Sequence, residues 1–283
     1  MSEPIIQRIR MPREELRRFE KLSVPFHEAM NLTPRGQAAI AAWQRLAPGP
    51  FVRWVTKFRW EPHHLERITT RRAPRGTLLV ANHRSFFDMF VTLTLLFIEH
   101  GMYRNLFFPV RSPFFYTNPL GSVVGGLFSG FAMWPPVFRD ERRRTLNPIG
   151  VQQILQVLSQ PDSCIGMHPE GTRNRGENAY EFLAPKPGTG QMVRETHPDT
   201  LVVPVFMKGL SNDIGLEIRR RIAPRLRREA PPIRWVFGEP MPAGEVARVG
   251  DDLAIAEFLL NDRIRALAEE SRELDRSGSV AAA

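Results

Sequence analysis

The sequence predicts an α/β fold with a mostly parallel central sheet flanked by helices. Short apolar runs typical of buried strands alternate along the chain with longer segments that show helical periodicity. The 283 residues are 42% hydrophobic and 24% charged, an ordinary globular composition that excludes a mainly disordered chain. The 25 prolines and 20 glycines argue against a simple helical bundle.

Apolar runs bounded by turn residues are predicted as strands, and helices are predicted between them. The strands are expected at residues 76–81, 106–110, 163–167, 201–207 and 233–237, with a further short strand within 131–138. The helices are expected at residues 85–99, 147–158, 189–196 and 251–274. Asn147 and Pro148 mark a helix start, because Asn is a favoured cap and Pro fits the first helical position. Site residues in such folds lie at the carboxyl ends of the strands.

The first 60 residues are expected to stand apart from the main domain. Residues 1–30 are polar and are predicted to form a loosely attached arm. Residues 29–60 hold five basic side chains, no acid and three of the five tryptophans, which suits an amphipathic helical segment at a membrane surface. A helical hairpin packed on the main domain is the alternative. The predicted division is therefore 1–60, a main domain at 61–276 and a flexible tail at 277–283.

The charge balance indicates an anionic partner. Lys and Arg number 39 against 30 Asp and Glu, which gives +9 and favours phosphate, anionic lipid or nucleic acid. No zinc-finger spacing or RNA-binding motif supports nucleic acid. The one cysteine, Cys164, excludes an intrachain disulfide and fits a reducing compartment. Residues 112–138 carry no charge, but prolines and glycines interrupt them, so a continuous membrane-spanning helix is not expected.

One reactive segment follows the strand predicted at 76–81. His83 and Asp88 are five residues apart, so they meet only if His83 lies on the loop and Asp88 in the first turn of the next helix. An aspartate bonded to one imidazole nitrogen leaves the other nitrogen as a base. The alternative is a capping histidine beside an unrelated acid.

A second reactive segment follows the strand predicted at 163–167. It is a Pro-Glu-Gly turn that carries a hydroxyl and two arginines. Gly171 allows a ligand to approach the backbone, and Arg173 can hold a phosphate by two hydrogen bonds. The alternative is an arginine-rich surface loop.

Together the two segments resemble the glycerolipid acyltransferase superfamily, whose best-known members are the lysophosphatidate (1-acylglycerol-3-phosphate) acyltransferases. His83 and Asp88, with Asn82 and Ser85, match the first block of the superfamily, N-H-x-S-x-x-D. Residues 168–174 match the block F-P-E-G-T-R-S at five of seven positions, with His and Asn as the two departures. Residues 202–205 resemble the fourth block, V-x-P-V.

The resemblance implies transfer of a fatty acyl group from acyl-CoA or acyl carrier protein to a hydroxyl of a glycerol-phosphate lipid precursor. The first expected acceptor is 1-acylglycerol-3-phosphate, which gives phosphatidate in phospholipid biosynthesis; glycerol-3-phosphate and lyso-ornithine lipid are alternatives. No cofactor or metal is implied, and the expected location is the cytoplasmic face of the membrane, peripheral or monotopic. A non-enzymatic protein that binds anionic lipid or nucleic acid is the alternative from another class.

The resemblance also assigns roles to residues. His83 would be the general base, and Asp88 would orient it. Substrate binding would fall to a larger set: Glu170, Gly171, Thr172, Arg173, Arg139 and Lys186. Arg139 stands where the second block of the superfamily is expected, and Arg142, Arg143 and Arg144 are rival candidates for its role.

Overall fold

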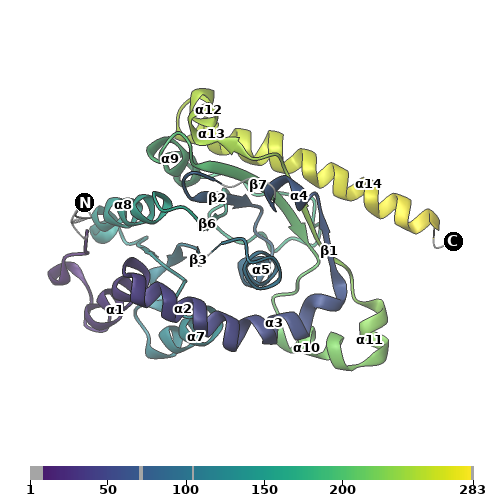
Figure 1. Ribbon diagram of the computed structural model, residues 1–283, viewed down its shortest axis with the longest axis horizontal. Helices are drawn as coiled ribbons and strands as arrows, with labels where there is room; N and C mark the ends of the chain where they lie inside the picture. Colours follow the sequence, from purple (N-terminus) through teal and green to yellow (C-terminus); the bar gives the residue numbers. More distant parts are fainter. Residues whose placement is uncertain (1–8, 70–72, 104, 282–283) are drawn as a thin grey trace. The chain divides into compact units, whose positions relative to one another are not determined.

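The computed structural model describes residues 9–69, 73–103 and 105–281, and Figure 1 labels its elements. The chain divides into two compact units. The first comprises Met1–Pro48 and Phe107–Val157, and the second comprises Gly49–Leu106 and Leu158–Ala283. The predicted α/β class with a mostly parallel, helix-flanked sheet is confirmed, and the sheet is built almost entirely from the second unit. The predicted division at residue 60 stays a prediction.

Within the described residues, the central sheet has seven strands. Its path runs β1 (Trp60–His63), β8 (Ile233–Phe237), β7 (Leu201–Lys208), β2 (Thr77–Ala81), β6 (Ser163–Met167) and β3 (Asn105–Phe107), and β9 (Met241–Pro242) pairs with β7. The pairs β1–β8, β2–β7 and β2–β6 are parallel, whereas β7–β8 and β7–β9 are antiparallel. All residues of β2 and β8 are buried, which explains why these runs are continuously apolar rather than alternating.

The register of the central strands sets the position of the site. Val80 of β2 lies opposite Met167 of β6, and Ala81 lies opposite Val205 of β7. The three strands run in the same direction, so the loops that follow them leave from one edge of the sheet. The loop after β2 and the loop after β6 carry the two reactive segments.

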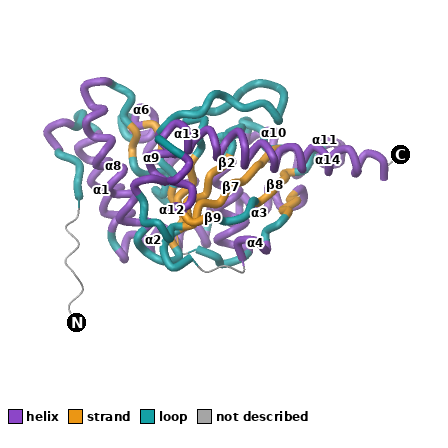
Figure 2. The backbone as a smooth tube through the Cα atoms, turned by 90° about the horizontal axis from the view of Figure 1, so that it is seen from above, coloured by secondary structure: helices purple, strands orange, loops and turns teal. Residues whose placement is uncertain are grey.

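Helices of the second unit cover both faces of the sheet. On one face lies α5 (Asp88–Leu93), where Trp235 Nε1 donates to Thr92 Oγ1 at 3.0 Å. On the other face α14 (Arg265–Ala281) runs across β7 and β8, where Arg234 Nη1 donates to Asp275 Oδ1 at 2.6 Å (Figure 2). Neighbouring strand residues point to opposite faces, which is why Arg234 and Trp235 contact different helices. The other helical segments of this unit are α3 (Pro48–Thr56), η2 (Lys57–Arg59), α4 (Glu66–Thr69), η3 (Thr94–Glu99), α9 (Gly188–Glu195), α10 (Ile214–Ile222), α11 (Pro224–Glu229), α12 (Ala243–Val246), η5 (Ala247–Val249), α13 (Asp252–Glu257) and η6 (Phe258–Ile264).

The first unit is mainly helical and holds a small two-stranded sheet. Its strands β4 (Val110–Arg111) and β5 (Pro136–Val137) are parallel. Its helices are η1 (Arg13–Glu15), α1 (Glu20–Leu32), α2 (Pro34–Leu46), α6 (Ser112–Phe115), α7 (Pro119–Ser129), η4 (Glu141–Leu146) and α8 (Asn147–Leu158). No helix of the described chain is both long enough and apolar enough to cross a membrane.

The loose arm predicted for residues 1–30 is wrong from residue 20 onward, because Glu20–Leu32 forms helix α1. The helix buries a polar face, so its sequence shows little apolar periodicity. Both carboxyl oxygens of Glu20 accept from Arg143 Nη1, at 2.8 and 2.7 Å. Ser23 Oγ donates to the carbonyl oxygen of Tyr116 at 2.9 Å.

Three other predicted boundaries also differ from the structure. The strand predicted at 106–110 is split between β3 and β4. The helix predicted from Ser85 begins at Asp88, because Ser85 and Arg84 donate their backbone N–H groups to the Asp88 side chain and form a turn. The tail predicted from Ser277 is helical up to Ala281, with Ser277 Oγ donating to the carbonyl oxygen of Glu273 at 3.1 Å.

Candidate active site

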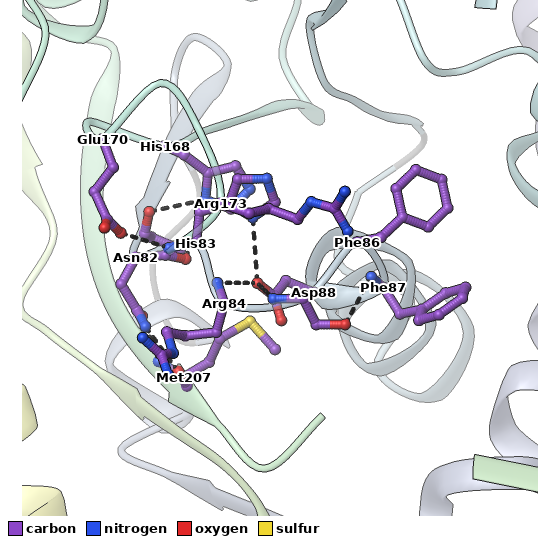
Figure 3. A network of polar contacts seen from close by, with 12 residues as sticks. Asn82, His83, Arg84, Phe86, Phe87, Asp88, His168, Glu170, Arg173 and Met207 are labelled. Atoms are coloured by element: carbon purple, nitrogen blue, oxygen red, sulfur yellow. Dashed lines mark hydrogen bonds and ion pairs between the residues drawn. The ribbon is translucent and has the colours of Figure 1, made fainter. Parts of the chain in front are cut away.

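His83 and Asp88 lie together after β2, in the arrangement that their spacing allows (Figure 3). His83 lies on the loop, and Asp88 is the first residue of α5. The distance from His83 Nδ1 to Asp88 Oδ2 is 3.4 Å, and Asp88 Oδ2 also accepts the N–H groups of Arg84 and Ser85, each at 2.8 Å. Catalytic hydrogen bonds are often this long without substrate and tighten in the complex. A proton on His83 Nδ1 would face the Asp88 carboxylate in this arrangement.

Asp88 has an altered proton affinity because it is buried. Its side chain is 2% exposed. Burial raises the pKa of Asp88 to about 6, against the opposing effect of the two backbone N–H groups that it accepts. Asp88 is therefore a carboxylate only above about pH 6, which links the pair to the pH of the solution.

Asn82 and Ser85 hold the first reactive loop against β7 and the loop that follows β7. The Asn82 side chain donates to the carbonyl oxygen of Met207 at 2.9 Å and accepts the Met207 N–H at 2.8 Å. Ser85 Oγ donates to the carbonyl oxygen of Ser211 at 2.8 Å. These two residues, which match the first block, fix the backbone on either side of His83.

Glu170 connects the two reactive loops and is almost fully buried. Its Oε1 accepts the N–H of His83 at 2.8 Å, and its Oε2 accepts the N–H of Leu183 at 2.9 Å. Burial raises the pKa of Glu170, while these two hydrogen bonds lower it. Because both carboxyl oxygens bind backbone, the contacts favour a role in holding the loop over direct contact with the acceptor.

Gly171 and Lys186 lie side by side in the second reactive loop. Gly171 has a φ of 62°, a left-handed conformation that favours glycine, and a Cβ there would lie 3.2 Å from Cγ of Lys186. The Lys186 N–H donates to the carbonyl oxygen of Pro169 at 2.8 Å. The structure thus brings Lys186 to the loop, and Thr172 follows Gly171 with a partly exposed side chain.

Arg173 is held by a residue that the sequence analysis missed, Asn212. Arg173 Nη1 donates to Asn212 Oδ1 at 2.7 Å, and the same oxygen accepts the N–H of Phe86 at 2.9 Å. The guanidinium carbon of Arg173 lies 6.0 Å from the centre of the Phe86 ring. Within the described chain, Arg173 forms no ion pair with a carboxylate. The guanidinium is thus oriented but keeps its charge available to an anionic ligand.

A second imidazole completes the site. The rings of His83 and His168 are stacked, with centroids 3.8 Å apart and planes inclined by 8° (Figure 3). His168 Nδ1 lies 2.9 Å from the carbonyl oxygen of Ala81 and 3.1 Å from that of Asn82.

The remaining predicted site residue, Arg139, belongs to the first unit, whereas His83 belongs to the second. Arg139 is exposed between β5 and η4. Among its rivals, Arg143 is buried and bonded to Glu20, which favours a structural role for it. Arg142 and Arg144 are exposed. The part that Arg139 takes in the site therefore stays a prediction.

A comparison with known protein families gives one match that covers this site. The family model described as Acyltransferase matches residues 62–208, just over half of the chain. The matched range contains both reactive loops and all of β7. A comparison with curated proteins gives no match. The chain is an enzyme that belongs to the acyltransferase family, within the glycerolipid acyltransferase superfamily.

Proposed function

We propose that this enzyme transfers a fatty acyl group from acyl-CoA or acyl carrier protein to the free hydroxyl of 1-acylglycerol-3-phosphate, giving phosphatidate. The observation that carries the proposal is the His83–Asp88 pair beside the Arg173 loop at one edge of the sheet. The arrangement supports the proposal because an imidazole can act as a base for a hydroxyl and a guanidinium can bind a phosphate.

His83 would act as the general base. With Asp88 holding a proton on Nδ1, Nε2 takes the proton of the acceptor hydroxyl while the hydroxyl oxygen attacks the thioester carbonyl carbon. The tetrahedral intermediate then expels the thiolate, and the imidazolium of His83 returns its proton to the sulfur. A thioester is already activated, so this route needs neither a covalent acyl-enzyme nor a cofactor.

The second reactive loop would bind the acceptor phosphate. Arg173 lacks a carboxylate partner in the described part of the chain, and Gly171 and Lys186 lie side by side in the same loop. Thr172 and Lys186 would add a hydroxyl and a second positive charge, and Arg139 is a further candidate from the first unit. Glu170 would keep the loop in place.

The second unit also offers a surface that supports attachment to an anionic membrane, at the cytoplasmic face. We define the basic–aromatic surface as Trp54 and Phe58 with the arginines of α10 and α11. Arg221 lies 5.8 Å from the ring centre of Trp54, and Arg227 lies 5.2 Å from that of Phe58. The Trp54 side chain is half-exposed. Aromatic rings interleaved with guanidinium groups suit the headgroup region of a lipid bilayer.

A second acceptor, glycerol-3-phosphate, is favoured by one residue. Arg84 directly follows His83, as in the first block of glycerol-3-phosphate acyltransferases, which this segment resembles. The Arg84 guanidinium donates to the carbonyl oxygen of Gly176, so it faces the second reactive loop. Lyso-ornithine lipid remains a third acceptor to be tested.

A thiol-release assay tests the proposal. Purified enzyme is given acyl-CoA or acyl carrier protein as donor and lysophosphatidate, glycerol-3-phosphate or lyso-ornithine lipid as acceptor, and product lipids are identified by mass spectrometry. The fastest release is expected with lysophosphatidate. Equal rates for the wild type and His83→Ala would overturn the mechanism, and release with another acceptor alone would replace the proposed substrate.

A further inference from the structure

His83 and His168 reach each other from neighbouring strands. His168 follows the last residue of β6, and His83 follows β2 with Asn82 between. Because β2 and β6 are parallel and in register at their ends, the two rings overlap face to face at 3.8 Å. Rings at this separation are in van der Waals contact, so each one limits the tilt of the other.

The surroundings of His168 determine where its proton lies. Nδ1 is within hydrogen-bond distance of two carbonyl oxygens, those of Ala81 and Asn82. A carbonyl oxygen only accepts, so Nδ1 must carry the proton, and the neutral ring then has its lone pair on Nε2. Burial lowers the pKa of His168 to about 3, and the adjacent His83 acts in the same direction, while Asp88 and the two carbonyls oppose them. The ring is therefore uncharged at neutral pH.

We propose that His168 is a positioning residue for acyl transfer: a neutral imidazole that holds the ring of His83 in the plane in which Nδ1 faces Asp88. The inference rests on the proposed function, because it takes His83 to be the base. The 3.4 Å separation of His83 and Asp88 leaves room for the imidazole to tilt. The stack limits that tilt, and the two backbone carbonyls hold the supporting ring in turn.

An uncharged neighbour also suits the charge that develops on His83. Proton transfer from the acceptor hydroxyl converts His83 to an imidazolium. A second imidazolium at 3.8 Å would repel it, whereas the face of an uncharged aromatic ring attracts a cation. His83 and Asp88 are the ionisable side chains that shift the pKa of His168, and Glu170 and Arg173 follow it in the same loop. An uncharged His168 adds no second positive charge beside His83.

The superfamily block that this segment resembles has Phe at the position of His168. Phenylalanine has a ring that can stack but no nitrogen that can bond to the Ala81 and Asn82 carbonyls. His168→Phe therefore keeps the stack without the hydrogen bonds, and His168→Ala removes both. Comparing the two separates the contribution of the ring face from a general effect on the fold.

The protonation of His168 can be measured without any activity. Long-range ¹H–¹⁵N spectra of the full chain with ¹⁵N-labelled histidine report which imidazole nitrogen carries the proton. We expect one ring, absent in spectra of His168→Phe, to keep its proton on Nδ1 from about pH 5.5 to 8. Titration of His168 in this range, or a proton on Nε2, would overturn the inference.

Steady-state kinetics test the positioning. His168→Ala should lower kcat by about 10- to 100-fold, because a misplaced base loses its near-attack geometry, with the KM of both substrates within about twofold. His168→Phe should restore kcat to within about fivefold of the wild type, and His197→Phe, an exposed histidine before β7, should leave it unchanged. Circular dichroism establishes that each variant is folded.

Each outcome bears on one proposal. Full kcat in His168→Ala, or a folded His168→Phe that is as slow as His168→Ala, overturns the positioning role of the stacked ring. If His168→Ala does not fold, the kcat of His168→Phe and the protonation seen in the spectra of the wild type test the inference instead. A wild type that releases no thiol with any acceptor overturns the proposed function instead, and the spectra still determine the protonation of His168.

Discussion

Asp88 combines two demands that oppose each other at the level of a single residue. The site needs a carboxylate beside His83, but burial favours the protonated acid and raises its pKa to about 6. Two backbone N–H groups and the N-terminal position on α5 only partly compensate. A functional requirement of this kind costs stability, because the enzyme keeps a buried negative charge above pH 6.

Replacing Asp88 by Asn should therefore lower activity and raise stability. Asn keeps an oxygen for the two N–H groups but cannot stabilise the imidazolium, so kcat should fall at least about 100-fold. The folded-state pKa lies above the unfolded value of 3.8, so the wild type gains stability from protonated Asp88 at low pH and loses it as pH rises through about 6. The variant should thus be more stable at pH 8 by up to about 3 kcal/mol, and equally stable below about pH 4.

Denaturant unfolding at several pH values and the pH dependence of kcat/KM check this prediction. The wild type should lose activity as pH falls through about 6, because protonated Asp88 no longer holds the Nδ1 proton. A variant that is less stable at pH 8, or an activity that does not change around pH 6, would contradict it.

At the level of elements, the loops that follow β2, β6 and β7 meet through the side chain of Asn212. Its Oδ1 accepts from Arg173 of the second loop and from Phe86 of the first, and its Nδ2 donates to the carbonyl oxygen of Arg84 at 3.3 Å. Asn212 itself lies in the loop that follows β7. One amide thus determines where the Arg173 guanidinium is presented.

Arg173→Ala should raise the KM for a phosphorylated acceptor by about 10- to 100-fold while changing kcat less, because it removes binding of a group that does not react. Asn212→Ala should also raise the KM for the phosphorylated acceptor, but by a smaller factor, because Arg173 keeps its charge and loses only its orientation. Arg175→Ala, an exposed arginine in the same loop, is the matched control and should leave KM within about twofold. Equal effects of Arg173→Ala and Arg175→Ala would mean that only the general positive charge of the loop matters.

The elements also show what the sequence could predict. Strands β2, β6, β7 and β8 are recognisable because central strands are buried on both faces and therefore read as continuous apolar runs. The contact between His83 and Asp88 could be predicted because a helix start between them leaves His83 on the loop and Asp88 in the first helical turn. Helix α1 is not predicted because its buried face is mostly polar and forms ion pairs and hydrogen bonds, so its apolar residues do not recur with helical periodicity. Asn212 was missed because its contacts join segments 39 and 126 residues apart, which spacing along the chain does not reveal.

At the scale of the whole molecule, the sequence carries a net charge of +9, and basic side chains gather at two places in the second unit. Arg173 and Lys186 lie at the reactive loops, and the arginines of α10 and α11 lie on the basic–aromatic surface. Some of these arginines are neutralised nearby: Arg225 pairs with Glu229 at 3.0 Å, and Arg219 lies 3.7 Å from Asp213. Arg227 and Arg228 are exposed and have no carboxylate partner within the described residues. The surface therefore presents uncompensated charge as well as exposed aromatic area.

The double variant Arg227→Gln/Arg228→Gln should bind vesicles of phosphatidylcholine and phosphatidylglycerol about 10- to 30-fold more weakly than the wild type, since each basic side chain near an anionic surface contributes about 1 kcal/mol. Arg219→Gln/Arg225→Gln removes the same net charge from paired positions, so its loss should stay within about threefold. Co-sedimentation measures both, and raising NaCl from about 0.1 M to about 0.5 M should remove the difference, because salt screens exposed charges. Equal losses in the two variants would show that net charge alone attracts the enzyme. Binding that persists in both variants and at high salt would instead place the membrane contact on apolar side chains elsewhere in the chain.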